Sequence, residues 1–134
     1  MKSTGTIRYG QTSNYVILDC CPELSKLYRH LFHLEVYKTR KLNKPLYGGH
    51  ITIVRNEDVP DKTLWNKYEG EIVEFDYFPP IGHNRYYWWL SVSCDRLYDI
   101  RIELGLPKEP LCPWHLTFGN ELIKPVDYDE RPFD

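Results

Sequence analysis

The chain has 134 residues, of which 17 are Lys or Arg and 19 are Asp or Glu, so its formal net charge is −2. This length predicts one compact domain, and 42% hydrophobic against 27% charged residues is typical of a globular protein rather than a disordered one. Proteins that bind long duplex nucleic acid carry an excess of basic residues, so the charge balance argues against that class and favours a nucleotide or short RNA as the ligand.

No segment has the length of a membrane helix and the N-terminus lacks a signal segment, so we expect a cytoplasmic location and no membrane partner. We also expect a monomer.

The four cysteines do not form a metal-binding pattern. Cys20 and Cys21 are adjacent, Cys94 and Cys112 stand apart, and none of them has the C-x2-C spacing of a zinc site. Adjacent cysteines in a chain without a signal segment are typical of reduced, partly buried thiols rather than of a disulfide framework. We therefore expect no disulfide framework, no metal and no cofactor.

Hydrophobic periodicity and turn residues predict a mixed order of strands and helices. The predicted elements are a short strand over 6–9, a strand over 15–19, a helix over 22–31, a basic connection over 35–48, a strand over 50–54, a loop or short helix over 58–68, a half-exposed strand over 71–77, a loop over 78–85, an aromatic strand over 86–94, a helix over 95–104 and a strand over 115–118. The tail, 121–134, is predicted to add one strand and then to fray.

Two short segments, His50-Ile51-Thr52-Ile53 and His115-Leu116-Thr117-Phe118, share the pattern histidine, apolar, threonine, apolar. Alternate side chains of a strand point to opposite faces, so each segment presents its histidine and threonine on one face and its apolar pair on the other. Five histidines and seven threonines in 134 residues would produce roughly 0.26 His-x-Thr matches by chance. One motif is therefore typical of an ordinary β surface, whereas two predict a shared site.

An internal repeat connects the two motifs. Residues 15–31 align with 88–104 at an offset of 73 residues, which places Cys21 on Cys94 and aligns the apolar residues of the two helices. Each copy reads strand, cysteine, amphipathic helix, loop and motif strand, which predicts pseudo-repeats over about 15–54 and 88–119 within a single domain. If these β-α-β units fold with pseudo-two-fold symmetry, the motif strands meet across one cleft.

The paired motifs resemble those of the 2H phosphoesterase superfamily, which includes 2′-5′ RNA ligase-like proteins and 2′,5′-phosphodiesterases. The signature of that superfamily is two His-hydrophobic-Thr/Ser-hydrophobic motifs, matched here at residues 50–53 and 115–118. The resemblance implies an α+β, two-lobed, pseudo-symmetric fold in which antiparallel sheets surround a central cleft and helices lie outside. It also implies a phosphodiesterase, and the short chain is similar to the minimal members found in viruses.

Two histidines and two threonines are sufficient for metal-free cleavage of a phosphodiester. An unperturbed imidazole titrates at about pH 6.5, so one ring can accept a proton from the attacking water or 2′-hydroxyl while the other donates to the leaving oxygen. Threonine hydroxyls can donate to the non-bridging oxygens. We therefore predict His50 and His115 as catalytic residues and Thr52 and Thr117 as phosphate-binding residues, which the resemblance also implies. Which histidine is the acid and which the base stays open.

Side chains that could stack a nucleobase or hold a phosphate are further, weaker candidates. The aromatic candidates are Tyr9, Tyr87 and Trp89, and the basic candidates are Lys44 and Arg85. Arg55 is disfavoured, because regular alternation along its strand would place it on the face opposite His50.

The sequence leaves the substrate and the function class open. The candidate substrates are an RNA end with a 2′,3′-cyclic phosphate, a 2′-5′-linked oligonucleotide and a cyclic oligonucleotide, in either RNA processing or the degradation of a defence signal. A second function class is a non-catalytic nucleotide- or RNA-binding module on the same fold. A third is a protein-interaction domain in which both motifs are structural. Turnover that disappears when the histidines are replaced would distinguish the enzyme from both.

Overall fold

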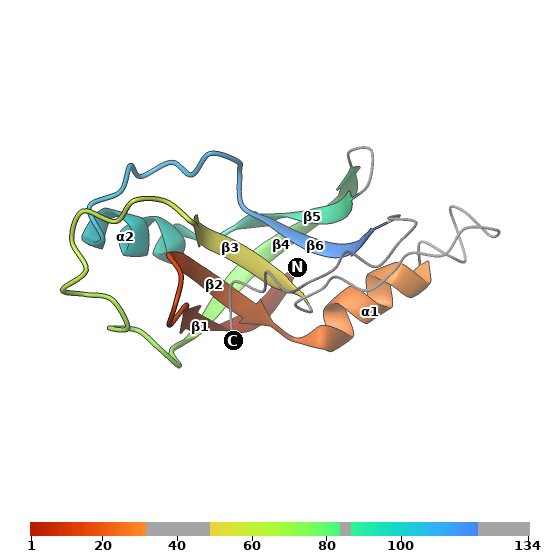
Figure 1. Ribbon diagram of the computed structural model, residues 1–134. Helices are drawn as coiled ribbons and strands as arrows, with labels where there is room; N and C mark the ends of the chain where they lie inside the picture. The colour runs from red at the N-terminus through yellow and green to blue at the C-terminus, as the bar shows by residue number, and fades with distance from the viewer. Residues whose placement is uncertain (32–48, 84–86, 121–134) are drawn as a thin grey trace.

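The computed structural model describes residues 1–31, 49–83 and 87–120, which form six strands and two helices (Figure 1). In chain order these are β1 (Lys2–Tyr9), β2 (Tyr15–Cys20), α1 (Pro22–Leu31), β3 (His50–Arg55), β4 (Ile72–His83), β5 (Tyr87–Ser93), α2 (Asp95–Glu103) and β6 (His115–Asn120). The predicted strands over 15–19 and 50–54 and the helix over 22–31 are confirmed with nearly the same bounds. The predictions for 35–48 and 121–134 lie outside the described residues.

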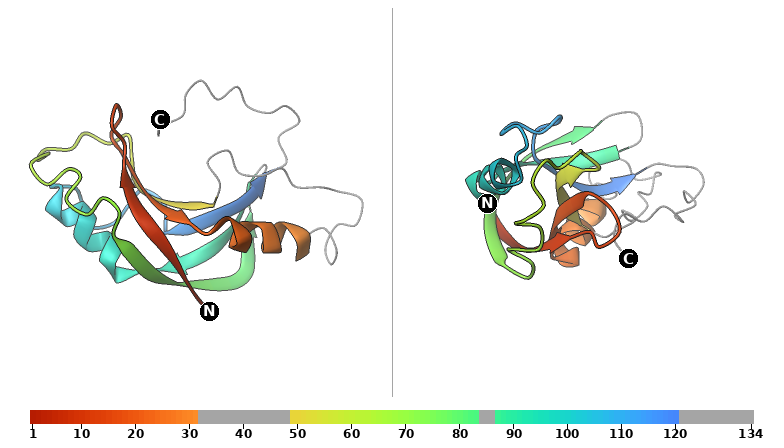
Figure 2. Two further views of the ribbon diagram at one scale, coloured as in Figure 1. Left: turned by 90° about the horizontal axis from the view of Figure 1, so that it is seen from below. Right: turned by 60° about the vertical axis from the view of Figure 1, so that its left-hand side comes forward.

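All six strands form one closed antiparallel barrel in the order β1-β2-β3-β6-β5-β4. Closure comes from β1, which pairs through residues 2–6 with residues 72–76 of β4 and through residues 5–9 with residues 16–20 of β2. Each described strand therefore has a hydrogen-bonded neighbour on both sides. Figure 2 shows the strands curving around one interior, with α1 and α2 beyond opposite ends of the barrel.

The predicted two-lobed α+β fold with sheets around a central cleft is wrong. Strands β3 and β6 are adjacent members of one barrel, and two short helices accompany a structure that is mostly β. The order strand, helix, strand does occur twice, with β2 paired to β3 and β5 paired to β6. However, β1 and β4 continue the sheet from β2 and β5 and pair with each other. This closure satisfies backbone groups that two separate lobes would leave unpaired at their edges.

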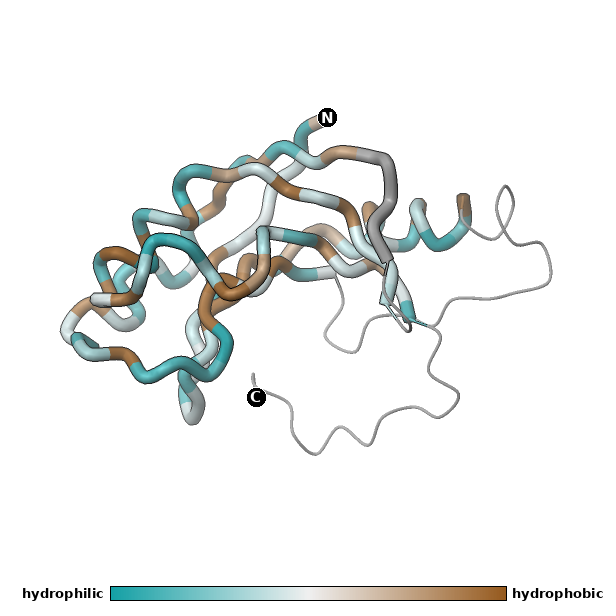
Figure 3. Tube along the Cα trace, turned by 90° about the horizontal axis from the view of Figure 1, so that it is seen from above, coloured by the Kyte–Doolittle hydropathy of each residue, from teal (hydrophilic) through white to brown (hydrophobic). Residues whose placement is uncertain are grey.

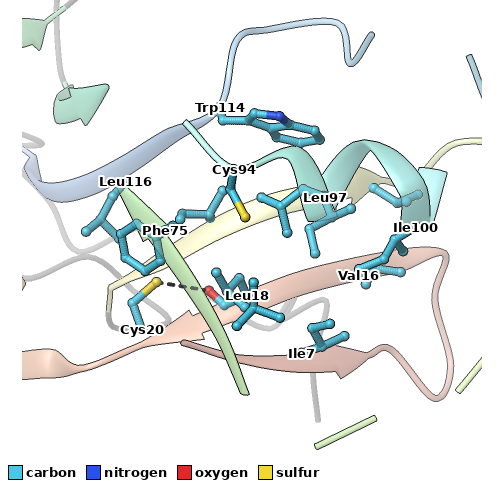
Figure 4. Close-up of a cluster of buried hydrophobic side chains, with 14 of the residues drawn as sticks. Ile7, Val16, Leu18, Cys20, Phe75, Cys94, Leu97, Ile100, Trp114 and Leu116 are labelled. Atoms are coloured by element: carbon cyan, nitrogen blue, oxygen red, sulfur yellow. Dashed lines mark hydrogen bonds between the residues drawn. The ribbon is translucent and has the colours of Figure 1, made fainter. Parts of the chain in front are cut away.

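The barrel interior holds one hydrophobic cluster to which every strand contributes alternate residues. Figure 3 shows the resulting alternation of hydrophobic and hydrophilic residues along the chain. Phe75 and Leu116 lie in this interior, and Leu97 and Ile100 of α2 pack over one end of it (Figure 4). At the other end α1 packs against β6. The two helices therefore close the barrel ends, which are the parts that strand pairing leaves open.

Strand β4 continues through a segment that was predicted to be a loop. Pro79 and Pro80 favour a loop over 78–85, yet β4 extends to His83. Proline cannot donate a ladder hydrogen bond, so a strand tolerates it only at an edge or an irregularity. The pairing of β4 with β5 shifts register between Phe78 and Gly82, and this irregularity accommodates both prolines. The loop prediction is therefore wrong over residues 78–83.

The reactivity of the four cysteines tests the closed barrel. All four are free; Cys20 and Cys94 are buried, whereas Cys21 and Cys112 are exposed. Burial raises the pKa of the Cys20 and Cys94 thiols, so less of the reactive thiolate forms. We expect iodoacetamide at about pH 7.5 to alkylate Cys21 and Cys112 in the folded protein, and the buried pair only after unfolding in urea. Peptide mass spectrometry measures this, and equal labelling of Cys20 and Cys21 in native buffer would contradict the barrel.

Candidate active site

The two predicted motifs lie side by side on the outer face of the barrel. Strands β3 and β6 are antiparallel and meet at one residue pair, Ile51 opposite Leu116, whose side chains are both fully buried. Opposite residues of an antiparallel pair share a face, and successive residues alternate between faces, so the residues that flank this pair point outward. These flanking residues are all half-buried, and we call them the His–Thr patch: His50, Thr52, His115 and Thr117.

The antiparallel order sets the positions within the patch. On either side of the Ile51–Leu116 pair, His50 lies toward Thr117 and Thr52 lies toward His115, so the two imidazoles occupy diagonal corners. Diagonal neighbours on regular strands are roughly 7–8 Å apart, which is within reach of long side chains. A phosphate group above this pair would therefore have an imidazole on two opposite sides and a hydroxyl beside each.

The strands on the two sides of the patch differ in chemistry. On β2, Asp19 lies directly opposite His50. On β5, Ser91 lies directly opposite His115, and Trp89 is two residues away on the same face. The His–Thr patch therefore has an acidic residue on one flank and an uncharged, aromatic flank on the other.

Two contacts hold the His115 ring. Its Nδ1 atom lies 2.9 Å from the carbonyl oxygen of Pro113, two residues earlier in the chain. The Trp89 ring lies against it, with the centroids 5.8 Å apart and the planes inclined by 59°. Because a carbonyl oxygen can only accept, the contact with Pro113 requires a proton on Nδ1. The other nitrogen, Nε2, is then the one that can exchange a proton with a substrate.

Close packing of α1 against Gly49, the residue before β3, positions His50. The backbone N–H of Cys20, just before the helix, donates to the carbonyl of Gly49 at 2.9 Å. A Cβ atom at position 49 would overlap the Ser25 hydroxyl, so only glycine lets the helix approach this closely. His50 follows Gly49 directly, and its place at the start of β3 is set by this contact.

The threonine hydroxyls are available as donors. Among the residues that the structure describes, neither the Thr52 nor the Thr117 side chain is engaged in a hydrogen bond. A hydroxyl can rotate to suit an acceptor, so both can turn toward the same ligand. Non-bridging phosphate oxygens are acceptors of the kind that two such donors would bind.

The weaker candidates are placed very differently. Trp89 is half-buried beside His115, and Tyr87 is 40% exposed on the same strand. Tyr9 is only 3% exposed and packs edge-on against Trp65 inside the structure, so its ring cannot stack a nucleobase. The two basic candidates, Lys44 and Arg85, lie outside the described residues.

Arg55 lies on the outer face, contrary to the prediction from regular alternation. The pairing of β2 with β3 contains a bulge in which Ile53 is the extra residue. Ile53 and Val54 are both buried, so the next residue, Arg55, emerges on the same side as Thr52 and is exposed. The bulge therefore adds a cation to the outer face beside the patch.

Sequence reasoning also missed Asp19. The residue ends a short β-branched strand, and nothing in its local pattern distinguishes it from an ordinary surface carboxylate. It becomes part of the site only because β2 pairs with β3 in a register that sets it opposite His50. That register is a long-range property, which local periodicity does not contain.

Neither a recognisable relative nor a metal centre points to a function. No family model, curated protein or solved structure matches the chain. Within the described ranges, no group of three or more His, Cys, Asp or Glu side chains is arranged to hold a metal ion. Of the two described helices, neither is long and apolar enough to cross a membrane.

Proposed function

We propose that this protein is a metal-independent phosphodiesterase that cleaves a nucleotide or short RNA phosphodiester, with His50 and His115 as the general acid–base pair. The observation that supports this most strongly is the shared outward face. Two segments 65 positions apart in the chain bring two imidazoles and two hydroxyls to adjacent strands around one residue pair. A purely structural role needs only the buried apolar residues of each motif, because an outward β surface accepts many polar residues.

The His–Thr patch contains each group that the reaction needs. Cleavage requires a base for the attacking oxygen, an acid for the leaving oxygen and donors for the non-bridging oxygens. The two imidazoles supply the base and the acid. The Thr52 and Thr117 hydroxyls donate to the non-bridging oxygens, where negative charge increases in the transition state.

The aromatic flank supports a nucleotide as the substrate. Trp89 lies against His115, and Tyr87 is partly exposed further along β5. Stacking of a base on an aromatic side chain contributes about 1–3 kcal/mol to binding. The exposed Arg55 can attract a second phosphate, while the net charge of −2 favours a short substrate over a long duplex. The substrates that fit are 2′,3′-cyclic phosphates, 2′-5′-linked oligonucleotides and cyclic oligonucleotides.

This proposal depends on the His–Thr patch and not on the predicted fold. The paired motifs resemble those of the 2H phosphoesterase superfamily, but the closed barrel differs from the two-lobed fold that this resemblance implies. Function is carried by sites rather than by folds, so the arrangement of the four side chains is the relevant argument.

A substrate panel tests the proposal. We expect the wild-type protein to cleave at least one of a set of 2′,3′-cyclic mononucleotides, 2′-5′ oligoadenylates and cyclic di- and trinucleotides in excess EDTA. The rate should be bell-shaped in pH, because one imidazole must be neutral while the other is protonated. Product analysis by chromatography measures the cleavage. The double variant His50→Ala/His115→Ala, purified in parallel, controls for contaminating phosphodiesterases.

The outcomes separate the three function classes. Cleavage that persists in the double variant, or that stops in EDTA, would overturn the proposal. Wild-type binding without cleavage, retained in the double variant, would identify a nucleotide-binding module. The absence of both binding and cleavage across the panel would favour an interaction domain.

A further inference from the structure

We infer that Arg29 of α1 binds the phosphate next to the scissile one, so that the substrate is an oligonucleotide with more than one phosphodiester group rather than a 2′,3′-cyclic mononucleotide. This inference rests on the proposed function and narrows its substrate class. In this assignment Arg29 determines specificity, because it contacts a part of the substrate that does not react.

Helix α1 packs against β6 and against the residue before β3, at one end of the His–Thr patch (Figure 1). A Cβ atom on Gly49 would overlap the hydroxyl of Ser25, so the helix touches the residue just before His50. Arg29 follows Ser25 by four residues, and side chains four residues apart share one face of a helix. The face of α1 that meets Gly49 therefore also carries Arg29.

A hydrogen bond to the β6 backbone places Arg29 beside Thr117. Its Nη1 atom donates to the carbonyl oxygen of Phe118 at 2.9 Å, and Phe118 directly follows Thr117. The pairing of β6 with β5 passes from Thr117 to Gly119, so Phe118 is the extra residue of a bulge, and its carbonyl is available to the helix. A guanidinium has five N–H donors, so this bond leaves most of them for a ligand.

Among the residues that the structure describes, Arg29 has no carboxylate partner. Three other arginines each lie within 3.4 Å of a carboxylate oxygen: Arg8, Arg96 and Arg101. Burial lowers the pKa of Arg29, which is the direction expected for a cation whose surroundings supply no negative charge. Taking a cation out of water is costly unless an anion compensates it, and Arg29 is half-buried. A phosphate would supply the missing charge, and guanidinium groups bind phosphate through paired N–H donors.

The position of Arg29 fits the spacing of adjacent phosphates in a nucleotide chain. If the scissile phosphate lies above the Ile51–Leu116 pair, Phe118 is two residues further along β6, which is roughly 7 Å. Six or seven covalent bonds separate adjacent phosphorus atoms, and the three backbone bonds of an amino-acid residue span about 3.5 Å, so adjacent phosphates can be roughly 7–8 Å apart. A 2′,3′-cyclic mononucleotide has no second phosphate to place beside Arg29.

Two substrates that differ in phosphate number test the inference. A 2′-5′-linked adenosine dinucleotide without terminal phosphates contains only the scissile phosphate, whereas the corresponding tetranucleotide contains three phosphates in a row. We expect Arg29→Gln to lower kcat/KM on the tetranucleotide by about 10-fold or more, because it removes a charge-assisted contact. The same variant should cleave the dinucleotide at the wild-type rate. Arg29→Lys keeps the charge and should retain more of the tetranucleotide rate than Arg29→Gln does.

Salt dependence distinguishes a phosphate contact from a structural role. Each phosphate that a protein neutralises on a single strand contributes about 0.7 to the slope of log affinity against log salt concentration. The double variant His50→Ala/His115→Ala should not cleave, so its affinity for a fluorescein-labelled 2′-5′ tetranucleotide can be measured by fluorescence anisotropy. Adding Arg29→Gln to this variant should reduce the slope by about 0.7. A purely structural Arg29 would change stability without changing the slope.

Arg96→Gln is the matched control. Arg96 is also a half-buried arginine on a helix, but α2 lies beyond the opposite end of the barrel and the guanidinium pairs with Glu71 at 3.2 Å (Figure 2). Its replacement removes the same charge, so both oligonucleotides should be cleaved at the wild-type rate and the salt slope should not change. The urea midpoint of each variant checks folding.

The outcomes distinguish this inference from the proposed function. An equal loss on the dinucleotide and the tetranucleotide in Arg29→Gln, or an equal loss in Arg96→Gln, would overturn the inference and leave the proposed function intact. A wild type that cleaves 2′,3′-cyclic mononucleotides but not the tetranucleotide would do the same. A wild type that cleaves no member of the panel would overturn the proposed function and the substrate class, while the salt slope would still decide whether Arg29 binds phosphate.

Discussion

His50→Ala and His115→Ala are each expected to lower kcat by about 10²–10⁴-fold, because each removes one of the two proton transfers of the proposed reaction. Both rings are half-buried on the outer face and are not part of the hydrophobic core, so the barrel should remain folded. The double variant should be little slower than the slower single variant, because both groups act in the same transition state. The measurement is kcat on the best panel substrate, with the urea midpoint as a check on folding.

His30→Ala is the matched control for these two variants. His30 is an exposed histidine in the last turn of α1. His30→Ala therefore removes one histidine, as His50→Ala and His115→Ala do, but it leaves the His–Thr patch unchanged. Its rate should equal that of the wild type. An unchanged rate in His50→Ala or His115→Ala would remove the catalytic assignment, and an equal loss in all three variants would indicate a general effect of losing histidine.

Glu57→Ala is expected to lower the free energy of unfolding by about 3 kcal/mol, because it leaves a buried guanidinium without its counter-charge. Arg101 of α2 is 1% exposed, and its Nη1 and Nη2 atoms donate to the two carboxylate oxygens of Glu57 at 2.7 and 2.8 Å. The guanidinium also donates to the carbonyl oxygens of Ile53 and Pro107. The expected loss is at the lower end for a buried pair because the Glu57 side chain is 33% exposed. Urea denaturation measures it.

The pH dependence of this stabilisation follows from the Glu57 carboxyl. The hydrogen bond from Arg101 lowers its pKa below the ordinary value of 4.5, and this effect outweighs burial, which raises it. A lowered pKa in the folded state means that the stabilisation is complete above pH 4.5 and is lost as the pH falls through the lower folded-state value. The difference between wild type and Glu57→Ala should therefore shrink in acid.

Glu71→Ala is the matched control for Glu57→Ala. Glu71 also pairs with an α2 arginine, Arg96, at 3.2 Å, but the two side chains are 42% and 30% exposed. An exposed pair contributes about 0–1 kcal/mol, so the control should lose far less stability than Glu57→Ala. Equal losses would show that the burial of Arg101 is not what makes its ion pair important.

The helix over 95–104 shows where local pattern and tertiary structure diverge. The spacing of Leu97, Ile100 and Leu104 predicts the helix and its buried face, and all three are at most 1% exposed. Arg101 reads as a surface cation in that pattern, yet it is equally buried. Its burial depends on Glu57 in the loop after β3 and on the carbonyl oxygen of Ile53 in β3, which both accept from it, and helical periodicity does not predict these contacts.

The sequence by itself determined which side chains of the two motifs, residues 50–53 and 115–118, point inward and which point outward, because that alternation is a property of extended backbone. It also determined the two helices that follow Cys21 and Cys94, since their apolar spacing is local. Only the tertiary structure decided that β3 pairs with β6, that β1 closes the barrel on β4 and that Asp19 faces His50. Many pairings satisfy the same alternation, and the choice among them depends on burial and hydrogen bonding summed over the whole sheet.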